Sequence, residues 1–387
     1  MSVKKAINRI HLWLGLASGL LVLFLGITGC ILAYQREIED LTQPYQFVSA
    51  QEAAQLAPSR LKAIADRALP GKQAHSISYE KGKASKVVYF SFAPEYYYIT
   101  FLDPYNGKVL KVKDMDRDFF RIVLNGHYYL WLPPAIGQPI VASATLIFVL
   151  LLITGLVLWW PKNKAARKQR FKIKWNAKWR RTNYDLHQVL GFYMTWVVLF
   201  TAITGLIMGF QWFSKSVYWA ASGGKQYEDF YEPPSDTTKL LTNTTMPAMD
   251  QLWIKMQQKH RLNGGSLEVH VPETKGTSIE VALNPDTETY WQTDYRYFDQ
   301  YTLKELPVTH LYGRFTAASA ADKIMRMNYD IHVGAIGGIV GKTIAFFASL
   351  LAASMPVTGF LIWWGRRNKK KKGALPEKHR QFEPANN

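Results

Sequence analysis

The chain has 387 residues and a formal net charge of +18 at pH 7. This length usually means two or three soluble domains, and such a charge suggests a nucleic-acid partner. The distribution of apolar residues argues against a soluble chain, because they are concentrated in four blocks whose interiors contain no Lys, Arg, Asp or Glu. The single cysteine, Cys30, lies in the first block, which excludes an intrachain disulfide and CxxC chemistry.

The four apolar blocks have the length of membrane-spanning helices, which need about 20 residues. The first block is too long for a removed signal peptide and lacks a small-residue cleavage site, so we expect it to anchor the protein. The sequence therefore predicts four transmembrane spans. They are Ile10–Tyr34, Pro139–Trp160, Leu186–Phe213 and Thr343–Trp364.

The positive charge flanks these spans on one side of the membrane. It is carried by Lys4, Lys5 and Arg9, by the loop Lys162–Arg181, and by the tail Arg366–Lys372. Because cytoplasmic segments carry an excess of Lys and Arg, both termini and the middle loop are expected inside and the two large loops outside. The charge is thus explained by contact with membrane lipid, and no nucleic-acid partner is expected.

The first large loop is predicted to form a small module of helix and antiparallel sheet. A turn at Asp103–Gly107 separates the last two strands, and an amphipathic helix at Phe119–Tyr129 precedes the second span. The other predicted elements are a helix at Gln51–Ala68 and strands at Ser76–Tyr79, Lys86–Phe92, Tyr97–Leu102 and Val109–Val112.

The second large loop has a similar plan. The stretch Tyr297–Leu306 stands where the first loop has its turn and last strand, and the helix Ala321–His332 precedes the fourth span. The cytoplasmic loop Pro161–Thr182 is too short and too basic for a folded domain. The remaining predicted elements are a helix at Met246–His260 and strands at Ser266–Val271, Ser278–Leu283 and Thr289–Asp294.

The two halves of the chain repeat each other in spacing. In the first and third spans, His11, Gly15 and Thr28 match His187, Gly191 and Thr204. Thr154, Gly155, Trp159 and Trp160 in the second span match Thr358, Gly359, Trp363 and Trp364 in the fourth. Since both halves begin on the cytoplasmic side, the repeat is parallel, with its axis along the membrane normal.

Four histidines occupy matched positions at the span ends. His11 and His187 lie near the cytoplasmic ends, and His127 and His332 lie just outside the opposite ends. A single histidine at a helix end is most often an interfacial or satisfied core residue. Two repeat-matched pairs favour a functional role, because polar groups at membrane depth are functional candidates by default.

Paired neutral imidazoles between facing helices are well suited to the axial positions of haem iron. Zinc or copper would need three or four nearby ligands, and no second Cys, His or carboxylate flanks these positions at the usual spacing. Arg121 and Arg326, each six residues before an outer histidine, are candidates to pair with haem propionates. His310 precedes the last outer helix and is a candidate to face a ligand cleft.

These motifs resemble the PepSY-associated transmembrane family, and within it the bacterial inner-membrane ferrisiderophore reductases, or iron-regulated membrane proteins. The resemblance covers Ile7 to Arg367 and rests on the His-x3-Gly openings, the Asp-Pro-x-x-Gly turn, and a His ahead of each Thr-Gly…Trp-Trp span. The second loop departs from the pattern, because Asp299 keeps the acid of the turn but no Pro or Gly follows at the matched places.

The resemblance implies a four-helix membrane bundle with two intertwined periplasmic PepSY-type modules, and so a membrane α+β fold class. It implies two b-type haems, held by the four histidines His11, His187, His127 and His332, which match the family's ligand positions. The implied activity is reduction of a ferric siderophore, which releases Fe(II). No fused flavin domain is present, so the electron donor is expected to be a separate molecule.

The resemblance also implies an inner-membrane protein with alternating cytoplasmic and periplasmic parts. The expected parts are the first span at 1–35, a periplasmic module at 36–126, a haem-ligand segment and second span at 127–160, a basic loop at 161–182, the third span at 183–213, a second module at 214–331, a haem-ligand segment and fourth span at 332–365, and a basic tail at 366–387.

Two other functions are consistent with parts of the pattern. An envelope binding or regulatory protein would use the outer modules without redox chemistry, and its histidines would be structural. A siderophore permease would be expected to have broken helices and polar groups near the membrane midplane. The four span interiors have neither feature clearly.

Overall fold

The computed structural model describes residues 2–161, 163–239, 245–259 and 265–372. Lys162, His260 and the predicted tail beyond Lys372 lie outside the described residues. The chain divides into two compact units: unit 1 is formed by residues 1–27, 143–199 and 347–387, and unit 2 by residues 28–142 and 200–346.

Among the residues that the structure describes, four helices are long and apolar enough to cross a membrane, as the sequence predicts. They are α1 (Val3–Ala33), α5 (Pro134–Trp159), α7 (Trp179–Gly209) and α11 (Gly338–Lys372). Each begins several residues before the predicted apolar block, and α11 also ends later. The additions to α1, α7 and the end of α11 are rich in Lys and Arg, which are favourable helix formers, so these helices continue past the apolar segments.

Small residues bring the helices of unit 1 close together. A Cβ atom on Gly26 in α1 would lie 2.8 Å from both the Cβ of Ala353 and the carbonyl oxygen of Ser349 in α11. This approach is typical of membrane helices, where small residues allow backbones to pack closely. An apolar cluster from α5, α7 and α11 completes this packing; it comprises Leu152, Met194, Val198, Ala348 and Ala352.

The strands of both large loops form one eight-stranded antiparallel sheet in unit 2, in the order β4-β3-β2-β1-β5-β6-β7-β8. The strands of each loop form one contiguous half of this sheet, and the two halves are joined at β1 and β5. Strand β1 pairs with β5 from Ser76–His270 to Glu80–Ser266, so each four-stranded half covers an edge of the other that would otherwise be open. The strands are β1 (Ala74–Glu80), β2 (Ser85–Phe92), β3 (Glu95–Leu102), β4 (Val109–Asp114), β5 (Ser266–His270), β6 (Ile279–Asn284), β7 (Asp294–Phe298) and β8 (Glu305–Leu306).

Strand β7 lies later in the chain than the sequence predicts. The expected strand Thr289–Asp294 is instead a turn, and the pairing with β6 runs from Asp294 to Phe298. The carboxylate of Asp330 explains the difference, because it accepts hydrogen bonds from the backbone N–H groups of Tyr290 and Trp291. These donors are therefore used by a helix side chain and are not available to a β ladder.

Asp103 and Asp299 build equivalent turns despite their different sequences. Asp103 Oδ1 accepts from the N–H of Tyr105 at 2.8 Å, and Asp299 Oδ1 accepts from the N–H of Tyr301 at 2.9 Å. Leu303 adopts a positive φ of 54° where the first turn has Gly107. The aspartate is thus a shared determinant of the two turns, since its side chain substitutes for a backbone acceptor.

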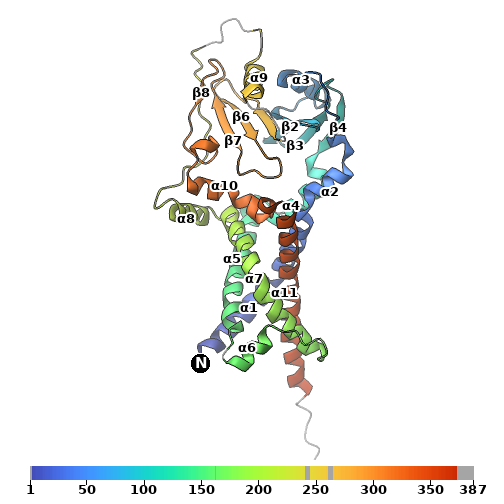
Figure 1. The fold of residues 1–387 in the computed structure, drawn as a ribbon, viewed down its shortest axis with the longest axis vertical. Helices are drawn as coiled ribbons and strands as arrows, with labels where there is room; N and C mark the ends of the chain where they lie inside the picture. The colour runs from blue at the N-terminus through green and yellow to red at the C-terminus, as the bar shows by residue number, and fades with distance from the viewer. Residues whose placement is uncertain (1, 162, 240–244, 260–264, 373–387) are drawn as a thin grey trace, which may run out of the picture. The chain divides into compact units, whose positions relative to one another are not determined.

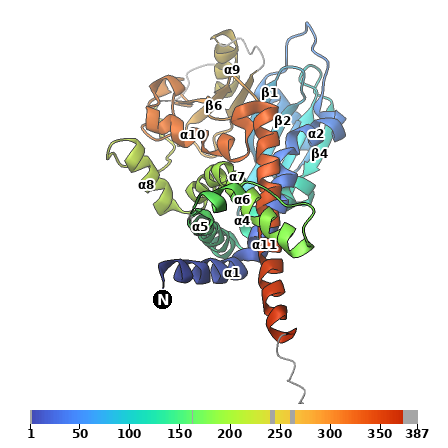
Figure 2. The ribbon, with the colours of Figure 1, turned by 60° about the horizontal axis from the view of Figure 1, so that its bottom comes forward.

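The sheet has an apolar face and a polar face. Helices α3 (Pro58–Ala68) and α9 (Ala248–Lys259) cover the apolar face, with Leu61, Leu252 and Met256 buried against the strands. Helices α4 (Phe119–Tyr129) and α10 (Ala320–His332) lie toward the other face (Figure 1). The helix α8 (Gln211–Ala221) lies beside α10, where the hydroxyl of Tyr218 donates to Asp322 at 3.1 Å (Figure 2).

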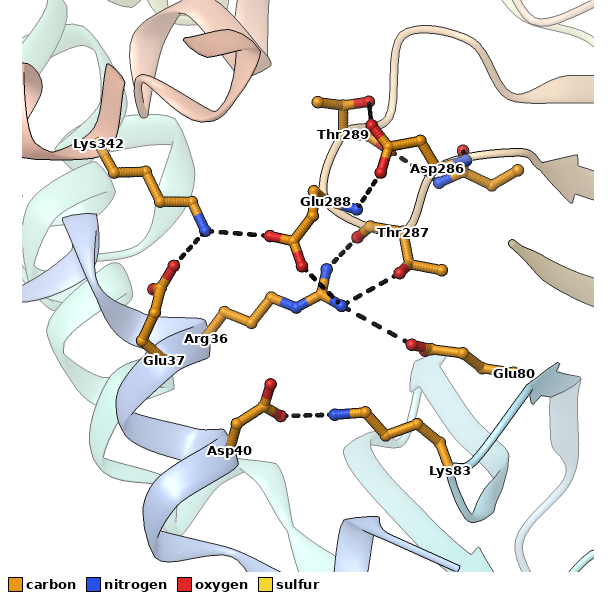
Figure 3. A network of polar contacts seen from close by, with 11 residues as sticks. Arg36, Glu37, Asp40, Glu80, Lys83, Asp286, Thr287, Glu288, Thr289 and Lys342 are labelled. Atoms are coloured by element: carbon orange, nitrogen blue, oxygen red, sulfur yellow. Dashed lines mark hydrogen bonds and ion pairs between the residues drawn. The ribbon is translucent and has the colours of Figure 1, made fainter. Parts of the chain in front are cut away.

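An ionic network joins several elements of unit 2 (Figure 3). Arg36, in the short helix α2 (Gln35–Thr42), contacts Glu80 of β1 and Glu288 of the β6–β7 loop. Lys342 of α11 lies 2.6 Å from Glu37 and 3.4 Å from Glu288. The network therefore ties the extensions of two spanning helices to both halves of the sheet.

Candidate functional site: two histidine pairs

The first histidine pair, His11 and His187, lies in unit 1 and lines a single cavity. His11 Nδ1 is 2.9 Å from the hydroxyl of Thr154, and His187 Nδ1 is 2.8 Å from the hydroxyl of Thr358. Each imidazole on α1 or α7 is thus held by a threonine on α5 or α11. The histidines are brought together as the sequence predicts, and each is oriented by a partner on another helix.

The hydrogen bonds of the threonines determine which imidazole nitrogen carries the proton. The hydroxyl of Thr154 lies 2.8 Å from the carbonyl oxygen of Leu150, and when it donates there it accepts from Nδ1–H of His11. The hydroxyl of Thr358 likewise donates to a carbonyl one turn earlier, that of Ser354, at 3.1 Å. Both histidines therefore carry the proton on Nδ1 and present the Nε2 lone pair, which is the form that binds a metal.

The cavity between these helices has a volume of about 920 Å³. This is within the usual range of about 300–1,000 Å³ for cofactor and ligand sites. Two glycines face the imidazoles: a Cβ on Gly155 would lie 3.5 Å from the ring of His11, and one on Gly359 would lie 3.4 Å from the ring of His187. The glycines therefore let the helices that carry them pack directly against the two rings.

The second histidine pair, His127 and His332, lies in unit 2, where α4 and α10 meet α1 and α7. His127 Nδ1 is 2.8 Å from the hydroxyl of Thr28, and His332 Nδ1 is 3.0 Å from that of Thr204. His332 Nδ1 is also 3.0 Å from the carbonyl oxygen of Thr201. A carbonyl only accepts, so Nδ1 of His332 carries the proton and its Nε2 is the acceptor nitrogen.

The rings of His127 and His332 lie near each other in unit 2. Their centroids are 6.4 Å apart and their planes make an angle of 65°. Burial lowers the pKa of His332, which keeps the imidazole neutral and able to act as a ligand.

Arg121 and Arg326 lie on the same helices as the second histidine pair, and their environments differ. The guanidinium of Arg326 donates to the carbonyl oxygens of Leu311, Thr293 and Gly313, which ties the loop after β8 to α10. Arg121 lies 5.2 Å from the ring centre of Tyr97, and its Nε has no hydrogen-bond partner among the described residues. The pairing of these arginines with propionates stays a prediction.

His310 does not face a ligand cleft, so that expectation is wrong. Its side chain is 5% exposed and is surrounded by the rings of Phe230, Tyr231 and Tyr297. Its Nε2 donates to the carbonyl oxygen of Tyr231 at 3.0 Å, and its Nδ1 accepts from the N–H of Tyr312 at 3.1 Å. Both nitrogens are therefore used, and the residue has a structural role.

The orienting threonines were missed as functional residues by the sequence reasoning. Thr28, Thr154, Thr204 and Thr358 stand out in the sequence only as matched members of the repeat. Their spacing from the histidines along the chain, 143 residues between His11 and Thr154, gives no indication of contact. A matched Thr-Gly in each span is the signal that could have identified them.

Comparison with known proteins supports the family but not the activity. The PepSY-associated TM region family matches residues 8–366, nearly the whole chain. The chain belongs to this family and is a multi-pass membrane protein with four apolar helices and one antiparallel sheet. No curated protein matches the chain.

Proposed function

We propose that this protein is a di-haem b membrane reductase that passes electrons across the inner membrane to a ferric siderophore. The observation that carries the proposal is the shared geometry of the two histidine pairs. Each histidine contacts, through Nδ1, a threonine hydroxyl on a different helix. For His11, His187 and His332, Nε2 has no hydrogen-bond partner among the described residues, so it is available to a metal.

A haem bound at each pair would supply one-electron transfer. The residues of the chain would orient the imidazoles and enclose the haem. The threonine hydroxyls fix the imidazole tautomer and ring orientation, as outer-shell partners do in other metal sites. Apolar side chains of α5 and α7, among them Leu152 and Met194, line the cavity of the first pair, and an apolar surrounding influences the redox potential of a bound haem.

The equivalent histidine–threonine contacts also favour a parallel internal repeat. Helices α1 and α7 each supply a histidine to the first pair and a threonine to the second. Helices α5 and α11 supply the threonines of the first pair. The two outer histidines come from α4 and α10, which hold equivalent places in the two halves of the chain.

The proposed substrate is the ferric ion of a siderophore, which the family resemblance implies. One electron reduces Fe(III) to Fe(II), and the siderophore is not itself changed. Because siderophores hold Fe(II) more weakly, the ion is then released. The proposed orientation places the sheet and the second histidine pair in the periplasm and the first pair toward the cytoplasm, where an unidentified donor delivers electrons.

The test is to purify the full chain in detergent and measure its absorption spectrum, its haem-to-protein ratio and its redox titration. We expect two haems per chain, and the single substitutions His187→Ala and His332→Ala are each expected to remove about half of the pigment. His75→Ala is the matched control, because His75 lies in the sheet against His270 and is expected to leave the spectrum unchanged.

A colourless wild type, or full pigment in both ligand variants, would contradict the proposal. Colourless and folded protein would instead favour an envelope binding or regulatory role. Activity is measured separately, as Fe(II) captured by a ferrous chelator after the dithionite-reduced protein is mixed with a ferric siderophore.

A further inference from the structure

We infer that helix α8 lies in the interface between lipid and water and inserts one face, formed by Trp212, Ser216 and Trp219, among the lipid headgroups. This membrane contact is additional to the four spans, and no haem is needed for it. The occupant of the face is the bilayer that α7 enters.

The position of α8 in the chain places it at the surface of the membrane. Helix α7 ends at Gly209, and α8 begins at Gln211. Phe210 between them is extended, with φ −126° and ψ 117°, so α8 does not continue the direction of α7. In Figure 1, α8 lies across the end of α7. A helix that turns aside directly after a span stays at the level where that span leaves the bilayer.

A second span begins at the same level. The carbonyl oxygen of Met208, near the end of α7, accepts a hydrogen bond from the side chain of Gln138 in α5 at 3.2 Å. A Cβ atom on Gly209 would lie 2.7 Å from the Cβ of Ala142, also in α5. The end of α7 is therefore packed against the beginning of α5, and α8 starts where both helices meet the membrane surface.

The exposed face of α8 has the side chains of an interfacial helix. Trp212, Ser216 and Trp219 are four and then three residues apart, so they lie on one side of the helix. The two tryptophans are 56% and 59% exposed. Tryptophan is enriched at membrane–water interfaces, because its ring is apolar and its N–H is polar. Two such rings on one helix face fit the headgroup region better than they fit water.

The polar groups on and beside this face have partners within the protein. The hydroxyl of Ser216 donates to the carbonyl oxygen of Trp212 at 2.8 Å, one turn earlier in the helix. Lys215, the single charged residue of α8, borders the face and lies 3.2 Å from Asp229. The face can therefore contact lipid without leaving its hydroxyl unpaired or burying an isolated charge.

Another side of α8 is attached to protein, which leaves the tryptophan face outermost. The hydroxyl of Tyr218 donates to Asp322 of α10 at 3.1 Å. Asp322 also accepts from the N–H of Ser319 in the capping box of α10. Helix α10 ends at His332. Contact of α8 with the bilayer would therefore also hold the helix that carries this histidine at the membrane surface.

The experiment is site-directed spin labelling of the full-length protein in nanodiscs of phosphatidylethanolamine and phosphatidylglycerol. In a Cys30→Ser background, single labels are introduced by Trp212→Cys, Ser216→Cys or Trp219→Cys. Collision of each label with O2, which concentrates in lipid, is compared with collision with Ni(II)-EDDA, which stays in water. Two exposed aromatic residues provide the matched references. Phe92→Cys on β2, at a position 85% exposed, reports water, and Phe200→Cys on α7, at a position 65% exposed, reports lipid.

We expect the ratio of O2 to Ni(II)-EDDA collisions at all three positions of α8 to lie between the ratios of the two references. Ratios equal to that of Phe92→Cys would overturn the inference, because the face would then lie in water. Poor access of both reagents would also overturn it, because protein would then cover the face, and dipolar broadening between labels would identify a second copy of the chain. Ser216→Cys keeps both tryptophans, so a water-like ratio there could not be attributed to a lost anchor.

Discussion

At the scale of single residues, the threonine hydroxyls orient the histidine rings by bonding to Nδ1. An imidazole that only filled space between helices would not need its proton fixed on Nδ1. Each of the threonine hydroxyls beside His11, His187 and His332 donates to a backbone carbonyl oxygen about one turn earlier in its own helix. It then accepts a hydrogen bond from Nδ1 of the histidine. The arrangement fixes the tautomer and leaves Nε2 as the acceptor nitrogen.

Under the proposed function, the substitution Thr204→Val should weaken haem binding at the second histidine pair. It removes the hydroxyl that contacts His332 and keeps the shape of the side chain. Loss of such a partner typically costs about 10- to 100-fold in metal affinity. Titration of the apoprotein with haem, followed by absorption, measures the change.

The matched control is Thr201→Val, one turn earlier on the same helix. Thr201 contacts His332 through its backbone carbonyl, which the substitution does not remove. Equal effects of the two variants would show that the hydroxyl of Thr204 does not orient the ring.

His310 makes the stability of unit 2 dependent on pH. Burial lowers the pKa of His310 below its ordinary value of 6.5. The unfolded chain takes up the proton more readily, so the stabilisation is fully present above pH 6.5 and is lost as the pH falls below it. Protonation would also remove the acceptor that the N–H of Tyr312 uses.

We therefore expect a lower thermal unfolding temperature at pH 5.5 than at pH 7.5. The difference should shrink in His310→Gln, whose amide does not titrate. A pH dependence that is the same in both proteins would exclude His310 as its source.

At the scale of elements, the spanning helices depend on small residues where their backbones meet. In Gly26→Ala, the added Cβ would lie 2.8 Å from Ala353 and Ser349, closer than carbon atoms normally approach. Overpacking of this kind costs about 1–3 kcal/mol. Thermal unfolding in detergent should show the loss, whereas Gly337→Ala, with no atom within 4 Å of the added Cβ, should have little effect.

The ionic network of unit 2 is a second contact between elements that can be tested. Lys342 is only 6% exposed and lies 2.6 Å from Glu37, so Lys342→Met leaves a poorly solvated carboxylate. We expect a loss of about 1–3 kcal/mol, the usual cost of removing a partner from a buried charged group.

Most of this loss should be recovered in the double variant Glu37→Gln/Lys342→Met, because neither charge is then left alone. A double-mutant cycle of the free energies of unfolding gives the coupling. Strictly additive losses would show that the two side chains do not interact.

At the scale of the whole molecule, the strands of the two large loops form one continuous sheet. Ser78 of β1 and Glu268 of β5 are directly opposite, although 190 residues separate them in the chain. Side chains directly opposite in an antiparallel pair have Cβ atoms about 4.5–5.5 Å apart, near the range that a disulfide requires.

Ser78→Cys/Glu268→Cys, in a Cys30→Ser background, should therefore form an intramolecular disulfide under mild oxidation. A mobility shift on a non-reducing gel detects it. Lys111→Cys/Glu268→Cys is the control, because β4 and β5 are separated by three strands in the sheet order. Cross-linking in both variants, or in neither, would contradict the single sheet.

The sequence by itself determined the features that depend on local pattern. The four spans follow from apolar length, and most strands and helices follow from periodicity and turn residues. The two histidine pairs are indicated because matched spacing in two halves of a chain is visible without coordinates.

Tertiary structure decided what depends on contacts between distant residues. The β1–β5 pairing that joins the two halves of the sheet, the turn held by Asp330 and the threonine partners of the histidines all link residues far apart in the chain. Hydrophobic and turn patterns report a residue's own environment and not the identity of its partner. For that reason the sequence locates the matched histidines, and only the fold shows which threonines orient them.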